Sequence, residues 1–250
     1  MIEETFASGR SFIHKTDPRC RVVAAILLCF VIALGRKIPM LWAGFGLSII
    51  LVMWARLNLV DVFKRLLAIW FFLLFLWAIL PFTCQGEVIW RMGKLGITRQ
   101  GIDLCTAITI KSNAVLLVFI ALITTMDFST LGYALNFFNA PKKLVHLLLL
   151  TYRYIFVIEE EHRRLVRAAK LRCFQPGTNM HTYRTYAYLC GMLFVRASAR
   201  AQRVYNAMKC RGFSGRFICL HEFAISRADK IWTLAILTAA ACLFFMETTL

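Results

Sequence analysis

Five predominantly apolar stretches limit the folds open to this chain more than any other feature. They cover residues 22–34, 40–54, 66–82, 104–124 and 231–246. A helix needs about 17–25 apolar residues to cross the hydrocarbon core of a bilayer. The whole chain is 60% hydrophobic with a mean hydropathy of +0.66, which is far more apolar than a soluble domain of this length. The sequence therefore predicts an all-α polytopic membrane protein with five transmembrane helices.

Two of these stretches contain or adjoin charge. The first is short for a span, so we expect its helix to begin near Pro18, with Arg19 and Arg21 snorkelling towards the headgroups. The fourth contains Lys111, and a cation at membrane depth usually faces the protein interior or water. A structural partner and a transport role are both open for Lys111. Residues 83–103, which include four glycines, are expected to form a loop.

The distribution of positive charge assigns the two sides of the membrane. Lysine and arginine number 4 in residues 1–21, 3 in 55–65 and 17 in 126–230. They number 2 in residues 35–39, 3 in 83–103 and none after 246. Because cytoplasmic loops carry the excess of positive charge, the N-terminus and residues 126–230 are predicted to be cytoplasmic. Nucleic acid is not an expected partner, since the basic segments alternate with the spans.

Three parts follow from this pattern. Residues 1–125 are expected to form a membrane domain with four spans, 126–230 a basic cytoplasmic domain, and 231–250 the last span. The cytoplasmic part is predicted to contain a short helix over 127–139 and two long helices, over 144–172 and 183–211.

A repeated basic segment lies in the two long helices. Residues 164–174 and 203–213 are 39 positions apart and agree at five of eleven positions. The identical pairs are Arg164 and Arg203, Ala168 and Ala207, Lys170 and Lys209, Arg172 and Arg211, and Phe174 and Phe213. Two copies are too few for a solenoid. They indicate one device that is presented to two equivalent partners.

The spacing gives this device a geometry. Since residues four apart share a helix face, each copy forms a stripe of two cations around a small residue: Arg164, Ala168 and Arg172, or Arg203, Ala207 and Arg211. Gly212 is a natural stop for the second helix because glycine tolerates a left-handed backbone. The first copy has Cys173 there, with Pro176 and Gly177 as the stop shortly after. Phe174 and Phe213 are placed to pack against the wall of a partner's groove.

Catalytic and metal-binding motifs are not found in the sequence. It contains no G-x-x-x-x-G-K-[ST] nucleotide-binding loop and no H-E-x-x-H motif, and its five histidines are isolated. The nine cysteines include no C-x-x-C pair. We therefore expect no catalytic residue, cofactor or metal site in this chain. For the repeat itself, the alternative interpretation is an amphipathic helix pair with ordinary solvated charge.

The residues described above resemble the T component of energy-coupling factor (ECF) ABC transporters, over nearly the whole chain. The resemblance begins at Ser11-Phe-Ile-His-Lys-Thr-Asp-Pro-Arg19 and includes Thr124-Thr125, Leu131, Pro141 and Tyr152-Arg153. Its most specific part is the pair Leu171-Arg172-Cys173 and Cys210-Arg211-Gly212, where the family usually has Ala-Arg-Gly. Cys173 departs from that pattern. The stretch 207–217 resembles the cobalt and nickel branch of the family.

The resemblance implies a non-catalytic coupling subunit of an ATP-driven importer in the cell membrane, for Co2+ or Ni2+. Each motif arginine would dock in a groove of one of two ATP-binding cassette ATPase subunits, which bind the ATP and Mg2+ themselves. A substrate-binding membrane subunit, either an S component or a metal-binding M-type subunit, would rest on the spans and on the apolar faces of the long helices.

Two other functions stay open. One is the same scaffold in a vitamin-specific ECF importer. The other is a self-contained secondary transporter or channel, against which stand the single intramembrane cation, the lack of an inverted repeat of broken spans and the large basic domain.

Overall fold

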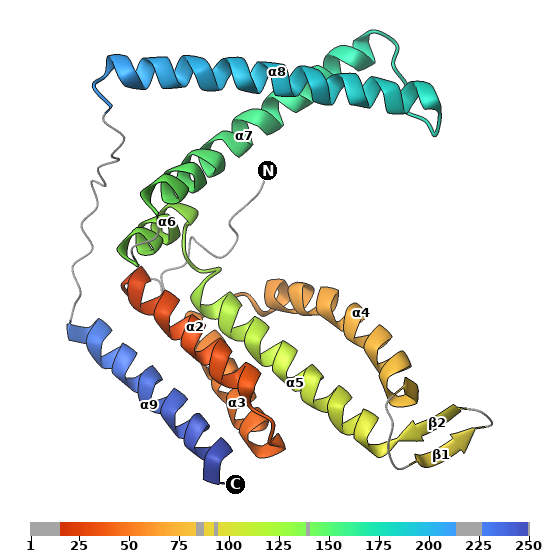
Figure 1. The fold of residues 1–250 in the computed structure, drawn as a ribbon, viewed down its shortest axis with the longest axis vertical. Helices are drawn as coiled ribbons and strands as arrows, with labels where there is room; N and C mark the ends of the chain where they lie inside the picture. The colour runs from red at the N-terminus through yellow and green to blue at the C-terminus, as the bar shows by residue number, and fades with distance from the viewer. Residues whose placement is uncertain (1–15, 84–87, 93–94, 139–140, 214–226, 250) are drawn as a thin grey trace. The chain divides into compact units, whose positions relative to one another are not determined.

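The computed structural model describes residues 16–83, 88–92, 95–138, 141–213 and 227–249. The predicted all-α class is confirmed, with one small addition (Figure 1). In chain order the elements are α2 (Pro18–Leu34), α3 (Ile38–Ala55), α4 (Leu59–Thr83), β1 (Val88–Met92), β2 (Leu95–Thr98), α5 (Arg99–Leu122), α6 (Phe128–Phe137), α7 (Lys142–Leu171), α8 (Met180–Cys210) and α9 (Arg227–Thr249).

The addition is an antiparallel hairpin within residues 83–103, where a loop was expected. Strands β1 and β2 pair from Val88 with Thr98 to Met92 with Leu95, with an irregularity between Val88 and Trp90. The run Val88-Ile-Trp90 is β-branched and aromatic, which favours an extended backbone. Pairing of the two strands also satisfies backbone groups that a loop would leave to solvent.

The chain divides into two compact units. The larger comprises Ile2–Ala134 and Phe223–Leu250, and the smaller comprises Leu135–Glu222. The first contains α2 to α5, the hairpin and α9, and the second contains α7 and α8. The predicted boundaries at residues 125/126 and 230/231 were drawn from charge and stay predictions.

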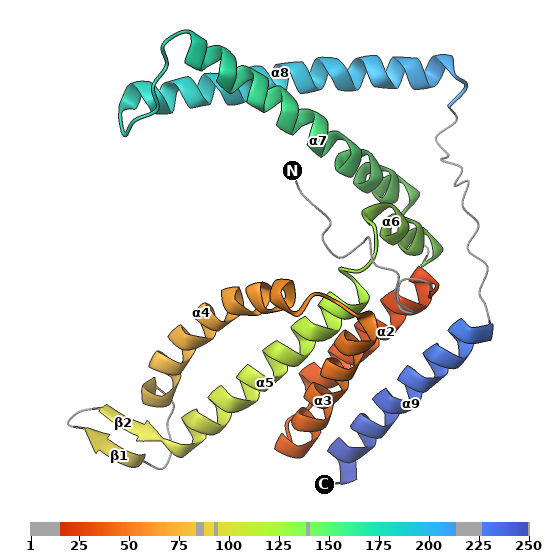
Figure 2. The same ribbon diagram turned by 180° about the vertical axis from the view of Figure 1, so that it is seen from behind.

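Helix α5 lies at the centre of the larger unit. It packs against α2, α3 and α4, while α9 packs against α2 and α3, so that helices from both ends of the sequence lie side by side (Figures 1 and 2). The main core combines small residues with large aliphatic ones. Its most buried members, none more than 1% exposed, are Leu28, Ile32, Ala55, Ala114, Val118, Ile120, Ala121 and Leu122. Close packing of this kind fixes the arrangement of the helices.

Four of the five predicted spans are long and apolar enough to cross a membrane: α3, α4, α5 and α9. Helix α2 has 17 residues, which is the short end of the range for a span. Its crossing of the membrane stays a prediction. As expected, α2 begins at Pro18, and the Asp17 carboxylate accepts a hydrogen bond from the Arg19 amide at 2.9 Å.

The expected snorkelling of Arg21 is wrong. Its side chain is 3% exposed, and it donates a hydrogen bond to the Thr125 hydroxyl beyond the end of α5. Thr125 supplies a buried acceptor to the guanidinium there, and Asp127 adds an electrostatic attraction.

Lys111 has a structural partner. Its Nζ donates to the carbonyl oxygen of Ala33 at 3.1 Å, in the last turn of α2. The last carbonyls of a helix have no partner within the helix, and a cation there also complements the helix dipole. Two other polar side chains of α5 accept hydrogen bonds from tryptophans of α4. The indole N–H of Trp70 donates to Asn113 at 3.1 Å, and that of Trp77 donates to Thr109 at 3.0 Å. The polar residues of this span therefore hold the helices together.

Candidate functional site

The repeated segment occupies the C-terminal turns of the two long helices. Helix α7 has 30 residues and α8 has 31, close to the predicted ranges. Arg172 is the C-cap residue of α7 and Arg211 is the C-cap residue of α8. Both arginines therefore lie where the helix dipole places partial negative charge, which favours a cation.

The two helix ends have the same hydrogen-bonding pattern. The Cys173 amide donates to Lys170 O at 3.0 Å and the Phe174 amide to Ala169 O at 3.1 Å. In the second copy, the Gly212 amide donates to Lys209 O at 2.9 Å and the Phe213 amide to Met208 O at 3.0 Å. These paired bonds form a Schellman motif at each end. The two copies of the repeat are therefore similar in backbone geometry as well as in sequence.

Cys173 takes the conformation expected of a glycine. Its φ is +62°, against +75° at Gly212. The first helix therefore stops at Cys173 itself, and the sequence was wrong to place the stop at Pro176-Gly177. A side chain in the left-handed region costs about 1–2 kcal/mol, and the two Schellman hydrogen bonds hold Cys173 there.

Exchanging the residues of the two caps is expected to change stability in opposite directions. Cys173→Gly should raise the free energy of unfolding by about 0.5–1 kcal/mol, because the relief of backbone strain exceeds the entropy cost of glycine. Gly212→Cys should lower it by a similar amount, since it introduces the same strain. Thermal denaturation in detergent, followed by the helical circular dichroism signal, measures both. If the free energy of unfolding changed in the same direction in both variants, the two helix caps would not be equivalent.

The six motif residues are all exposed: Leu171, Arg172, Cys173, Cys210, Arg211 and Gly212. Leu171, beside Arg172, is 87% exposed. Among the described residues, neither Arg172 nor Arg211 forms an ion pair. Each helix end therefore presents a cation that is available to a partner.

The supporting residues of the stripes differ between the copies. Arg203, Ala207 and Ala168 are exposed. Arg164, however, pairs with Glu160 one turn earlier at 3.0 Å, and its stripe is therefore partly occupied within α7. Phe174 packs on α8, with ring centroids 5.8 Å from Tyr186 and 6.3 Å from His181.

Phe174 was expected to pack against the groove of a partner. Its ring instead packs on the first turns of α8. Phe213 is half-buried. The motif residues Ser11–Lys15 and Ser214–Phe217 lie outside the described residues.

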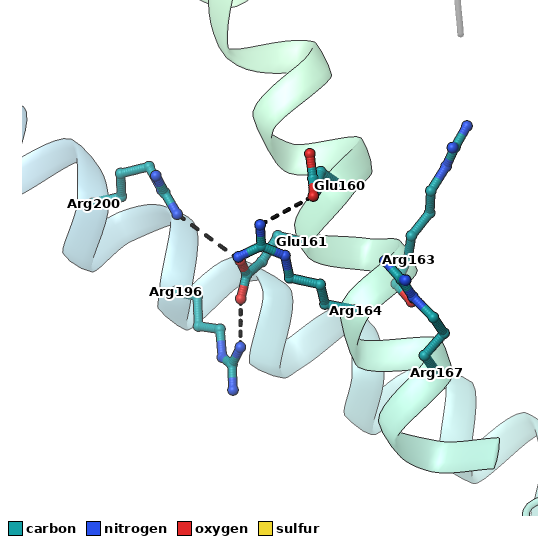
Figure 3. A network of polar contacts seen from close by, with 7 residues as sticks. All are labelled: Glu160, Glu161, Arg163, Arg164, Arg167, Arg196 and Arg200. Carbon is teal, nitrogen blue, oxygen red and sulfur yellow. Dashed lines mark hydrogen bonds and ion pairs between the residues drawn. The ribbon is translucent and has the colours of Figure 1, made fainter. Parts of the chain in front are cut away.

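A network of charges that the sequence analysis missed joins α7 to α8 (Figure 3). Glu161 on α7 forms an ion pair with Arg196 of α8, and its second oxygen lies 3.9 Å from Arg200 of the same helix. The Glu161 side chain is 14% exposed. The signal in the sequence was a run of three glutamates, 159–161, and two arginines four residues apart on α8.

Within the run, Glu161 forms the ion pairs with α8 that are described above. Glu159 and Glu160 pair with Arg163 and Arg164 inside α7. The hydrogen bond from Arg196 holds the pKa of Glu161 below its usual range, with further electrostatic contributions from Arg164 and Arg200. Glu161 therefore fixes the point where α7 and α8 meet.

Glu161→Gln is expected to loosen this contact. Hydrogen exchange at neutral pH should become faster around residues 190–200 of α8. Because the pKa of Glu161 is lowered in the folded protein, its contribution is complete above the ordinary glutamate pKa of about 4.3 and is lost as the pH falls below it. Acidification of the wild type below that pKa should therefore also loosen the contact between α7 and α8. Glu160→Gln serves as the control, since Glu160 pairs only within α7, and equal exchange in the two variants would contradict the role of Glu161.

No group of three or more histidine, cysteine, aspartate or glutamate side chains is arranged to hold a metal ion in the described part of the chain. The seven cysteines that the structure describes are free thiols.

Comparison with known proteins places these features in a family. Residues 9–219 match the sequence model of the CbiQ family, described as cobalt transport protein. The chain is similar to several energy-coupling factor transporter transmembrane proteins. It is 27% identical to that of Listeria innocua over 86% of this chain and 85% of the relative, and 26% identical to that of Brevibacillus brevis over 84% and 83%. The Bacillus subtilis relative is 26% identical over 99% of this chain and 98% of its own. Since the family match covers most of its length, the chain belongs to the CbiQ family of membrane transport proteins.

Proposed function

We propose that this chain is the T component of an ATP-driven ECF importer, and that it couples two ATPase subunits to a substrate-binding membrane subunit. The observation that carries the proposal is the pair of matching helix ends. Each presents an exposed arginine at a Schellman cap, with no ion pair in the described residues. Because the ends of α7 and α8 present the same surface, they are suited to bind two similar partner subunits.

The chemistry of these ends indicates what they bind. A guanidinium is always charged and presents a planar fork of donors that matches a carboxylate. A groove with acidic residues on each ATPase is the complementary surface. The exposed Ala168 and Ala207, one turn before each arginine, allow a groove wall to approach the helix closely. ATP and Mg2+ are then bound by the ATPases, and this chain needs no cofactor of its own.

The charge distribution supports an orientation. With 17 lysines and arginines in residues 126–230, the N-terminus and helices α7 and α8, which we call the coupling helices, face the cytoplasm, where the ATPases are. The substrate-binding subunit contacts the spans and the apolar side chains that α8 exposes, such as Phe194 at 76% and Val195 at 61%.

For the cargo we propose Co2+ or Ni2+. The match to the cobalt transport family and the cobalt-branch resemblance of 207–217 support this. The vitamin-specific alternative is favoured by a different observation, which is that the names of the relatives above specify an energy-coupling factor and no metal.

The function is tested by co-expression with the two ATPases and a substrate-binding subunit. The wild-type chain should retain both ATPases through purification and support ATP-dependent uptake in proteoliposomes. Uptake by this chain alone would instead indicate a secondary transporter.

The source of specificity gives a second expected result. In the described part of the chain no metal-binding group is present, so uptake should follow whichever substrate-binding subunit is supplied. Isothermal calorimetry with CoCl2 or NiCl2 should show no tight binding to the isolated chain. Binding of Co2+ or Ni2+ to the isolated chain with micromolar affinity would contradict the proposal that this chain is a scaffold.

A further inference from the structure

A buried polar cluster surrounds the first turn of α2. It consists of Asp17 and Arg21 at the start of α2, Thr125 after α5, and Asp229 in the first turn of α9. Their exposed fractions are 4%, 3%, 2% and 7%, respectively. We call these four residues the α2 polar cluster. They come from three distant parts of the sequence.

Hydrogen bonds connect the cluster in two directions. Towards α5, Arg21 donates through Nη2 to Thr125 Oγ1, and the Thr125 hydroxyl donates to Ala121 O at 2.9 Å. Towards α9, the Asp17 amide donates to Asp229 Oδ1 at 3.4 Å. The start of α2 is therefore bonded to the end of α5 and to the beginning of α9.

An apolar contact reinforces the α5 side. Val22, Met126 and Ala134 pack together, with exposed fractions of 6%, 8% and 0%. Asp127 adds an electrostatic attraction to Arg21. The segment that follows α5 is thus fixed to α2 by both polar and apolar contacts.

The residues of the α2 polar cluster lie on both sides of the segment that contains α7 and α8. The unit that contains α7 and α8 comprises Leu135–Glu222, so the chain has only two covalent connections to it. The chain leaves the larger unit after Ala134 and returns to it at Phe223, so Thr125 precedes this excursion and Asp229 follows it. Thr125 and Asp229, one on each side of the excursion, therefore bond to Arg21 and Asp17 at the start of α2.

We propose that the α2 polar cluster transmits movement of the coupling helices α7 and α8 into the larger unit, with Thr125 and Asp229 as positioning residues before and after the segment that contains these helices. The proposal rests on the proposed function as a coupling subunit. Buried hydrogen bonds are directional and cannot slide as apolar contacts do. Displacement of either connection is passed to α2, which packs on both α5 and α9.

The other end of α9 offers a matched control. There Glu247 accepts hydrogen bonds from the amides of Arg36 and Lys37, at 3.0 and 3.3 Å. Glu247 and Asp229 are thus both α9 carboxylates that bind backbone amides beside α2. Only Asp229 lies at the end of α9 that follows α7 and α8 along the chain. Loss of either carboxylate removes anchoring of α9, but only loss of Asp229 should affect transmission.

The experiment compares Thr125→Val, Asp229→Ala and Glu247→Ala in the complete complex with both ATPases and a metal-binding subunit. The readouts are ATPase retention, ATP hydrolysis and uptake of radiolabelled Co2+ into proteoliposomes. Thr125→Val and Asp229→Ala should retain the ATPases and hydrolyse ATP, while Co2+ transported per ATP falls about tenfold, within the range typical of coupling between sites. Glu247→Ala should keep the wild-type ratio. Asp229→Asn, which keeps an acceptor oxygen, should restore most of it.

Each other outcome overturns the proposal. An unchanged ratio in the cluster variants, or an equal fall in Glu247→Ala, would show that the cluster only stabilises the bundle, as would loss of assembly in both cluster variants. These results leave the proposed function intact. Absence of ATPases from the wild-type preparation would overturn the proposed function, and this inference with it.

Discussion

Replacing both Arg172 and Arg211 with alanine is expected to release the ATPase subunits and abolish uptake. Truncating one partner of a buried, hydrogen-bonded charge pair costs roughly 2–5 kcal/mol, much of it from the charge left unpaired. The two helix ends act together, so a single replacement leaves the complex tethered at the other end. Each single variant should therefore keep part of its assembly. Pull-down of the ATPases and ATP-dependent uptake measure both effects.

Two further variants separate docking from general loss of charge. Arg172→Lys or Arg211→Lys should rescue poorly, because an ammonium cannot replace a bidentate fork. Arg167→Ala is the control, since Arg167 is exposed on α7, donates to the Arg163 carbonyl oxygen at 3.3 Å, and has Asn206 as its counterpart in the repeat. Wild-type assembly and uptake in the double variant would mean that the stripes are ordinary solvated surface.

Gly101→Val is expected to separate α4 from α5 and to lower the free energy of unfolding by about 3 kcal/mol, the upper part of the range for overpacking. A Cβ at Gly101 would lie 2.8 Å from the Cα of Pro81 and 2.9 Å from Thr98 Oγ1. The backbone of Pro81 cannot yield as a flexible side chain can. The hydrogen bond from Thr98 to Pro81 O, 3.2 Å long, should be lost as well.

The matched control is Gly46→Ala in α3. A Cβ there meets nothing within 4 Å, so the change should be neutral or stabilise the protein by about 0.5–1 kcal/mol through helix propensity. Unfolding midpoints in detergent, followed by tryptophan fluorescence, compare the two. Equal stability of Gly101→Val and the wild type would mean that α4 and α5 do not approach as closely as the structure indicates.

The sequence by itself determined the elements whose signal is local. Apolar runs of sufficient length predicted the helices that became α3, α4, α5 and α9, because the bilayer sets the length that a span must have. Helix propensity and the repeat predicted two long helices that end at Arg172 and Arg211, since both signals lie within a few turns of each residue. Asp17-Pro18 likewise predicted the start of α2.

Only the tertiary structure decided how the charged side chains are used. Arg21 is buried on Thr125, Lys111 caps α2, and Glu161 joins α7 to α8. In each case the partner lies 35 to 104 residues away along the chain. Local pattern cannot predict such partners, because a cation near a span has the same sequence signature whether it snorkels or is buried. The left-handed conformation of Cys173 was hidden for a related reason: its backbone is held by the Schellman hydrogen bonds of the helix end, against the preference of its own side chain.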